Sequence, residues 1–135
     1  MRKLVFLDSG VLIAAARCLD AIARRALAIL SDPDLDFASS VFVRLEVLPK
    51  PLHHKKLAEA EFYQAFFGSV SVWAKPTGEL IDAAYDEAVR TGLSAMDAIH
   101  VVSAATVGAS ELHTSEKPGR PIHRTKLIRV CSIHP

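Results

Sequence analysis

Four acidic residues lie where a carboxylate could take part in chemistry. Asp8 follows an apolar run, Glu46 interrupts an apolar segment, Asp97 opens a segment of small and apolar residues, and Glu116 follows a second short apolar run. If the fold brings these carboxylates together, either some of them are protonated or a cation lies among them. Oxygen-only ligands favour Mg²⁺ or Mn²⁺, which polarise phosphodiesters and activate water. The pattern therefore indicates metal-dependent phosphoryl chemistry.

Each acid also has an ordinary structural explanation. An aspartate after a strand, such as Asp8, often caps the next helix, and Ser94-x-x-Asp97 has the spacing of a capping box. Glu46 lies in a helix predicted to be buried nearly all round, where an ion pair with a nearby arginine would hold it. A histidine such as His100, one turn after Asp97, is more often a core residue than a ligand. On sequence alone these alternatives stay open.

The elements that must position the acids follow an alternating order. The run Leu4-Val5-Phe6-Leu7 is typical of a strand buried on both faces of a parallel sheet. In such a sheet the carboxyl ends of the strands meet at one edge, where ligands bind. Further strands are predicted at 35–38, 69–73, 111–114 and 127–133. Helices are predicted at 11–17, 21–30, 41–48, 50–67, 78–90 and 93–107. An α/β fold with a mostly parallel sheet follows.

Length and composition narrow the class of protein. With 135 residues, half of them apolar, the chain is predicted to form one domain, 1–135, with a well-covered core. It contains no apolar run of the roughly 18–20 residues that cross a bilayer, and its first residues lack a signal-peptide pattern. We therefore expect a cytoplasmic protein. The net charge of +1 excludes overall basicity as an argument for nucleic-acid binding.

Two local features remain. Cys18 and Cys131 lie in unrelated contexts without CxxC spacing, so they are predicted to be reduced core residues rather than zinc ligands or a disulfide. Residues 117–129 are basic and contain no acid, which suits a phosphate backbone; a solvated loop at the sheet edge is the alternative. The sequence offers no competing nucleophile, since it lacks a G-x-S-x-G elbow and a P-loop.

Four segments together resemble the PIN domain, in particular the single-domain toxin ribonucleases of the VapC type. They are Leu7-Asp8-Ser9-Gly10-Val11-Leu12-Ile13, Arg44-Leu45-Glu46, Ser94-Ala95-Met96-Asp97-Ala98-Ile99-His100 and Thr114-Ser115-Glu116, in the family's order. The resemblance implies a three-layer α/β/α sandwich and an endoribonuclease that depends on Mg²⁺ or Mn²⁺. It also implies an RNA substrate, a small antitoxin partner and a homodimer.

Carried over residue by residue, the resemblance implies that Asp8, Glu46 and Asp97 hold the metal and that Glu116 is the fourth catalytic acid. Three departures distinguish this chain from the family pattern: Gly10 replaces a common asparagine, Glu116 is longer than the usual aspartate, and Pro118 replaces a further aspartate. The last two departures weaken or remove carboxylate ligands on the side of the site that, in the family, holds a second metal or the water. Predicted RNA contacts are Ser9, Thr114, Arg120, Arg124 and Lys126.

Two other functions follow from the same residues. The departures from the family pattern are compatible with a catalytically weakened PIN-fold module that binds RNA or protein through residues 117–129. A phosphotransferase with Asp8 as nucleophile ranks last, because such enzymes need a second aspartate where this chain has Gly10. An antitoxin helix would lie in an apolar groove, for which the candidates are Leu12, Ile13, Phe62 and Phe66.

Overall fold

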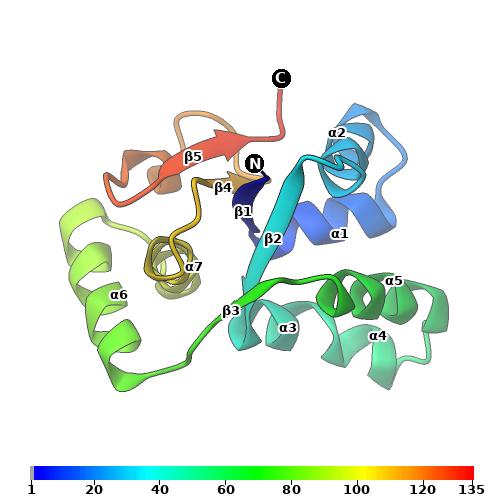
Figure 1. The fold of residues 1–135 in the computed structure, drawn as a ribbon, viewed down its shortest axis with the longest axis horizontal. Helices are drawn as coiled ribbons and strands as arrows, with labels where there is room; N and C mark the ends of the chain where they lie inside the picture. Colours follow the sequence, from blue (N-terminus) through cyan, green and yellow to red (C-terminus); the bar gives the residue numbers. More distant parts are fainter. Residues whose placement is uncertain (1) are drawn as a thin grey trace.

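A computed structural model describes residues 2–135 and shows a five-stranded sheet with the order β3-β2-β1-β4-β5 (Figure 1). Every strand pairs with its neighbour in parallel. The strands are β1 (Lys3–Leu7), β2 (Leu35–Ser40), β3 (Val72–Ala74), β4 (Glu111–Thr114) and β5 (Arg129–Ser132). The prediction of an α/β fold with a parallel sheet is confirmed.

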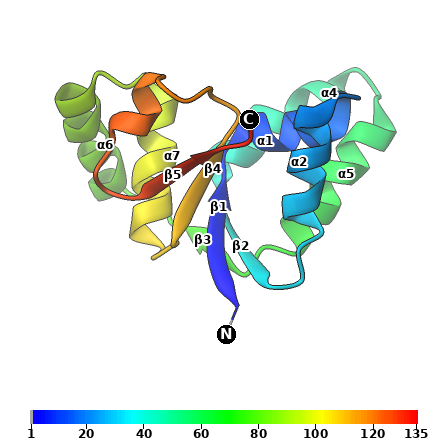
Figure 2. The same ribbon diagram turned by 90° about the horizontal axis from the view of Figure 1, so that it is seen from above.

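Helices cover both faces of this sheet and give it three layers (Figures 1 and 2). One face carries α1 (Ser9–Arg17), α2 (Ala21–Leu30), α3 (Val41–Val47), α4 (Pro49–His53) and α5 (Leu57–Gly68). The other face carries α6 (Gly78–Thr91) and α7 (Ala95–Thr106), and a 3₁₀ helix, Pro121–Arg124, precedes β5. The α/β/α sandwich is therefore confirmed. Within residues 2–135 no helix is both long and apolar enough to span a membrane.

Strand β1 lies in the middle of the core, as its uninterrupted apolar sequence predicts. Val5, Phe6 and Leu7 have no exposed surface. The ring of Phe6 packs against that of His100 on α7, with centroids 6.2 Å apart. Side chains alternate along a strand, so Phe6 faces α7 while Val5 and Leu7 face α1. Burial on both faces fixes where β1 ends and therefore where Asp8 lies.

One predicted helix is wrong near Pro49. The predicted helix 50–67 is two helices, α4 and α5, separated at residues 54–56, where Lys55 has a positive φ of 56°. Helix α3 ends at Val47, within one residue of the prediction, and Pro49 then begins α4. A proline fits the first turn of a helix because its φ is already helical and its missing N–H has no partner there. The chain therefore turns once more before α5.

Several burial predictions are also wrong. Helix α3 is not buried all round, since only Val43 and Val47 are buried and Leu45 is 67% exposed. Cys18 is exposed rather than a core residue, and Cys131 is half-buried; both are free thiols. Leu12, predicted to line a partner groove, is fully buried, whereas Phe62 and Phe66, also predicted for it, line a small pocket of about 230 Å³. Apolar sequence identifies core candidates, but it does not show which side of a short helix the sheet covers.

Candidate active site

The fold places the four predicted acids around the carboxyl edge of the sheet. Asp8 directly follows β1, and Glu46 lies on α3, the helix that follows β2. Asp97 is in the first turn of α7, and Glu116 is two residues beyond β4. Three of the four positions are fixed by the point at which a parallel strand ends or a buried helix begins. Residues distant in sequence thus contribute to one region, as the alternating order predicts.

Asp8 is both a helix cap and a buried acid. Its Oδ1 accepts a hydrogen bond from the Val11 backbone N–H at 3.1 Å, and its Oδ2 accepts one from the Thr114 hydroxyl at 2.5 Å. The residue is only 5% exposed. Burial raises the pKa of Asp8 to about 6, and the negative charge of Asp97 adds to the rise. Asp8 therefore caps α1, and this capping role is compatible with the role predicted for it at the site.

Asp97 interacts electrostatically with each of the other three acids. Its backbone N–H donates to the Ser94 hydroxyl at 3.3 Å, which confirms Ser94 as the helix cap. Burial raises the pKa of Asp97, and the charges of Glu116 and Glu46 raise it further. Because Asp97 also acts on the pKa of Asp8, its carboxylate lies within electrostatic reach of all three. The structure therefore brings the four acids into one charged region.

Glu46 is held by a partner that the sequence analysis assigned to the core. Its Oε1 accepts hydrogen bonds from His100 Nε2 at 2.6 Å and from the Ser9 hydroxyl at 2.5 Å. The His100 hydrogen bond lowers the pKa of Glu46. The expected arginine partner is therefore wrong, and Glu46 keeps a side-chain exposure of 33%. The signal for His100 was its place one helical turn after Asp97, on the same face of α7.

Thr114 connects the first acid to the fourth. It has no exposed surface, its hydroxyl donates to Asp8, and the backbone N–H of Glu116 donates to its oxygen at 3.1 Å. The carboxylate of Glu116 is half-exposed and lies 3.5 Å from Arg120 Nε. A buried threonine therefore positions both acids, whereas the sequence analysis gave it a contact with RNA.

Gly10 is explained by close packing at the site. A Cβ at this position would lie 1.8 Å from the Ser115 hydroxyl oxygen and 2.8 Å from its Cβ. Ser115 belongs to the loop after β4 that leads to Glu116. The missing side chain on α1 thus lets this loop approach the first turn of the helix. Ser115 occupies the space that a side chain at position 10 would need, which explains why this chain has glycine there.

The other predicted RNA contacts divide between two places. Ser9 is buried and donates to Glu46, and Arg120 lies beside Glu116 at the acidic site. Arg124 and Lys126 instead line a separate pocket of about 410 Å³ against α6, together with Glu87 and Arg90. The structure does not bring these two basic residues to the acids.

The donor set fits a hard divalent cation bound loosely. All four acids offer only oxygen, and among residues 2–135 the only Lys or Arg paired with any of them is Arg120. No three of these acids bring ligand atoms within 4.8 Å of one another in the described chain. Mg²⁺ is usually held by one or two carboxylates and keeps several waters. The arrangement therefore suits Mg²⁺ or Mn²⁺ better than an ion that needs a closed protein cage.

Comparison with known families and structures gives matches that cover most of the chain. The family model of the PIN domain matches residues 5–117. The VapBC2 structure from Rickettsia felis, bound to a DNA fragment of its promoter, is similar with a TM-score of 0.70 and 12% identity. The alignment covers 96% of this chain and 98% of the other.

Two further solved structures share the fold. DNA-bound VapBC from Salmonella typhimurium has a TM-score of 0.66 and 18% identity, over 98% of this chain and 99% of the other. VapC20 from Mycobacterium tuberculosis, described as a toxin that cleaves the sarcin–ricin loop, has a TM-score of 0.63 and 18% identity. That alignment covers 87% of this chain and 92% of the other. The search of curated proteins gave no match.

Proposed function

The chain belongs to the PIN domain family, and from this premise we propose that it is a metal-dependent endoribonuclease, the toxin of a toxin–antitoxin pair. In this proposal residues 1–135 form one PIN-like domain that acts on RNA in the cytoplasm. The observation that supports it most directly is the gathering of Asp8, Glu46, Asp97 and Glu116 at one edge of the sheet, with a single arginine at the rim. Acids with raised pKa values that lie near other acids, as Asp8 and Asp97 do, are candidates for functional sites.

Asp8 and Asp97 are the residues that would hold the cation, with Glu46 as a direct or water-mediated ligand. A bound Mg²⁺ or Mn²⁺ ion supplies polarisation of the phosphodiester and a lowered pKa of water. Burial is the largest cause of the raised pKa values of Asp8 and Asp97, and the charge of His100 offsets it only in part. A cation at the site would favour the ionised form of both acids.

The remaining residues would position the acids and the attacking water. Thr114 and the Val11 N–H fix both oxygens of Asp8, so this carboxylate has a defined direction before any ligand arrives. Ser9 and His100 both donate to Oε1 of Glu46, which leaves Oε2 available. Glu116, half-exposed beside Arg120, would orient a water or receive a proton at the open side of the site.

The same proposal includes an antitoxin and a second copy of the chain. Two of the similar structures are toxin–antitoxin complexes bound to DNA. On this chain a groove of about 680 Å³ lies over α3, α4 and α5, and exposed Leu45 and Leu52 contribute to it. An amphipathic helix of an antitoxin would place its apolar side chains in such a groove. This groove is larger than the pocket of about 230 Å³ that Phe62 and Phe66, two of the expected groove residues, line.

The test is cleavage of a mixed single-stranded RNA in the presence of EDTA, Mg²⁺ or Mn²⁺. We expect the wild type to cleave only with a metal and Asp8→Asn to be inactive, since asparagine still caps the helix but is a poor cation ligand. Asp86→Asn, which removes the same charge from the exposed face of α6, is the matched control and should stay active.

Two results would contradict the proposal. Cleavage that persists in EDTA, or in Asp8→Asn, would show that the acids are not the site. Absence of cleavage with every metal, from folded protein, would favour the weakened binding module; RNA binding lost on charge reversal of Arg120 would then support that module.

A further inference from the structure

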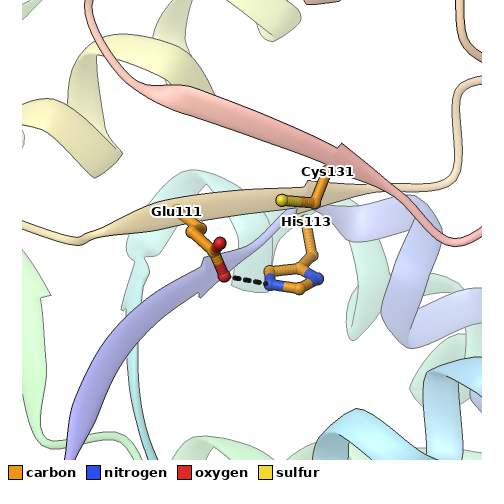
Figure 3. Close-up of side chains that lie close together, drawn as sticks. All are labelled: Glu111, His113 and Cys131. Carbon is orange, nitrogen blue, oxygen red and sulfur yellow. Dashed lines mark hydrogen bonds and ion pairs between the residues drawn. The ribbon is translucent and has the colours of Figure 1, made fainter.

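A second group of metal-type ligands lies away from the four acids, on β4 and β5. Glu111, His113 and Cys131 each offer a ligand atom, and these atoms lie within 4.8 Å of one another. Figure 3 shows the carboxylate and the imidazole on the same side of β4, with the sulfur of Cys131 directed toward them from the neighbouring strand. Nε2 of His113 and Oε1 of Glu111 are 3.2 Å apart.

Strand register explains why these side chains meet. Glu111 and His113 are two residues apart on β4, so they point to the same face. His113 is the parallel-sheet partner of Cys131 on β5, which places the thiol on that face as well. In the same sheet Phe6, which faces α7, pairs with Leu112. The three ligands are therefore on the opposite face of the sheet, the α1 side.

We propose that Glu111, His113 and Cys131 form a binding site for Zn²⁺ that links β4 to β5. One sulfur, one nitrogen and one oxygen donor are a set that zinc accepts, whereas Mg²⁺ and Ca²⁺ prefer oxygen alone. Three protein ligands leave a fourth tetrahedral position for water. On binding, Cys131 loses its thiol proton to solvent and coordinates as the thiolate.

The geometry requires only small side-chain movements. With zinc–ligand bonds of about 2.0–2.3 Å, the ligand atoms of a tetrahedral site lie about 3.5 Å apart. His113 Nε2 and Glu111 Oε1 are already 3.2 Å apart, so only the pairs with Cys131, which lie within 4.8 Å, need to approach, by roughly 1 Å at most, which rotation about the side-chain bonds provides. The site is also accessible, because His113 keeps 15% side-chain exposure and Cys131 is half-buried.

Two cations compete with the metal for Glu111. Lys3 Nζ lies 2.9 Å from Oε1, and Arg129 Nη1 lies 3.5 Å from Oε2. Their side chains are 46% and 76% exposed, so each can turn into solvent, and exposed ion pairs of this kind contribute little to stability. Without a metal this network neutralises Glu111. The competition makes a sharp prediction: removing Lys3 should tighten zinc binding.

A cation here would act on the neighbouring site through β5. This edge strand pairs only with β4 among the described strands, and the Ser132 hydroxyl donates to the backbone oxygen of Glu116 at 2.7 Å. His113 accepts a backbone hydrogen bond from Asp8 at 3.0 Å. Binding would therefore hold in place the strand ends that position two of the four acids, without occupying their carboxylates.

The test is a titration of chelator-treated protein with Co²⁺, a spectroscopic substitute for Zn²⁺. We expect one Co²⁺ per chain, with near-ultraviolet thiolate-to-cobalt absorption and the visible bands of a tetrahedral ion. Zn²⁺ should displace the Co²⁺, and excess Mg²⁺ should not. Cys131→Ser should abolish the thiolate absorption and His113→Asn should weaken binding. Cys18→Ser, which changes the exposed second thiol, is the matched control and should bind as the wild type does.

Further measurements separate this site from the four acids and from loss of folding. Asp97→Asn should keep the cobalt spectrum, and Zn²⁺ should raise the Tm of the wild type and of Cys18→Ser but not of Cys131→Ser. Lys3→Ala should lower the Kd for Zn²⁺. The proposal is overturned if the wild type shows no thiolate absorption, if Cys131→Ser retains it, or if Lys3→Ala binds zinc more weakly.

Discussion

Asp8 and Glu87 are both buried carboxylates, but Glu87 has an arginine partner and Asp8 has hydrogen bonds from neutral groups. Glu87, on α6, is 1% exposed and fully satisfied: Arg90 donates to its Oε1 at 3.0 and 2.6 Å, and Thr125 donates to its Oε2 at 2.6 Å. Asp8 receives hydrogen bonds from neutral donors only, Thr114 and the Val11 N–H. Burial is the largest effect on the pKa of Asp8 and leaves it raised; the charge of His100 lowers this pKa and that of Asp97 raises it.

The presence or absence of an arginine partner distinguishes Glu87, a structural acid, from Asp8, a candidate metal ligand. A buried carboxylate beside an arginine is already neutralised, and here it fastens α6 to the loop before β5. Asp8 and Asp97, which form no ion pair with a Lys or Arg among the described residues, have pKa values raised mainly by burial, and such acids are candidates for binding a cation. The sequence shows both as acids in helical or strand-end contexts. Only the neighbours distinguish them, and the following predictions test that distinction.

The largest expected effect is on RNA cleavage. Asp97→Asn should lower the metal-dependent rate about 1,000-fold, because it removes the acid that interacts with each of the other three. Glu87→Gln makes the same chemical change in the neutralised region and should leave the rate nearly unchanged. Initial rates on one RNA at saturating Mg²⁺ measure both. Equal losses in the two variants would show that the comparison does not identify the site.

The second effect is on the free energy of unfolding at pH 7. We expect it to rise when the charge of Asp8 is removed and to fall when Glu87 is removed. The folded-state pKa of Asp8, raised from 3.8 to about 6, means that the folded protein binds this proton more tightly than the unfolded chain. The free energy of unfolding therefore falls as the pH rises from about 4 to about 6, by about 3 kcal/mol at most, since each pKa unit is worth about 1.4 kcal/mol.

In metal-free urea denaturation, Asp8→Asn should thus be more stable than the wild type at pH 7 and no more stable at pH 4. Glu87→Ala should be less stable at pH 7 by about 2 kcal/mol, since it leaves Thr125 without its partner. Adding Mg²⁺ should narrow the gap between the wild type and Asp8→Asn. A destabilised Asp8→Asn at pH 7 would contradict the raised pKa.

The smallest effect concerns His100, a positioning residue. The His100 hydrogen bond keeps the pKa of Glu46 low, so His100→Asn should let that pKa rise. We expect cleavage at neutral pH to fall roughly tenfold, as for other residues that orient metal ligands, and the acidic limb of the pH–rate profile to move to higher pH. His53→Asn, on the exposed end of α4, is the control. A tenfold loss with an unshifted profile would indicate a purely structural role.

Much of the fold could be predicted because its signals are local. The apolar run before Asp8 gives β1, Asp20 caps α2, and Gly92 ends α6 in the left-handed conformation with φ 74°. Helix α2 has the predicted bounds, 21–30, and β4 the predicted bounds, 111–114. Errors appear where local signals conflict, as at Pro49. A proline ends one helix and begins the next with the same chemistry.

The candidate site was predicted less completely than the fold. Acids at strand ends could be selected, because parallel strands bring their carboxyl ends to one edge. The residues that hold those acids could not: Thr114 was assigned to RNA and His100 to the core, although both donate to the acids. A hydrogen bond between residues 106 positions apart, such as Thr114 to Asp8, has no signature in local sequence. The roles of the four acids stay predictions.

The sequence by itself determined the alternation of strands and helices, the end of β1 at Asp8 and the order of the four acids, because propensity, burial pattern and capping act over a few residues. Only the tertiary structure decided which charges meet. It paired Glu87 with Thr125, gave Glu46 a histidine in place of an arginine, and set Cys131 beside Glu111 and His113. The missing CxxC spacing led to the prediction that neither cysteine is a zinc ligand. Spacing alone cannot address a site assembled across two strands, because strand register, which sets such contacts, depends on the packing of the whole sheet.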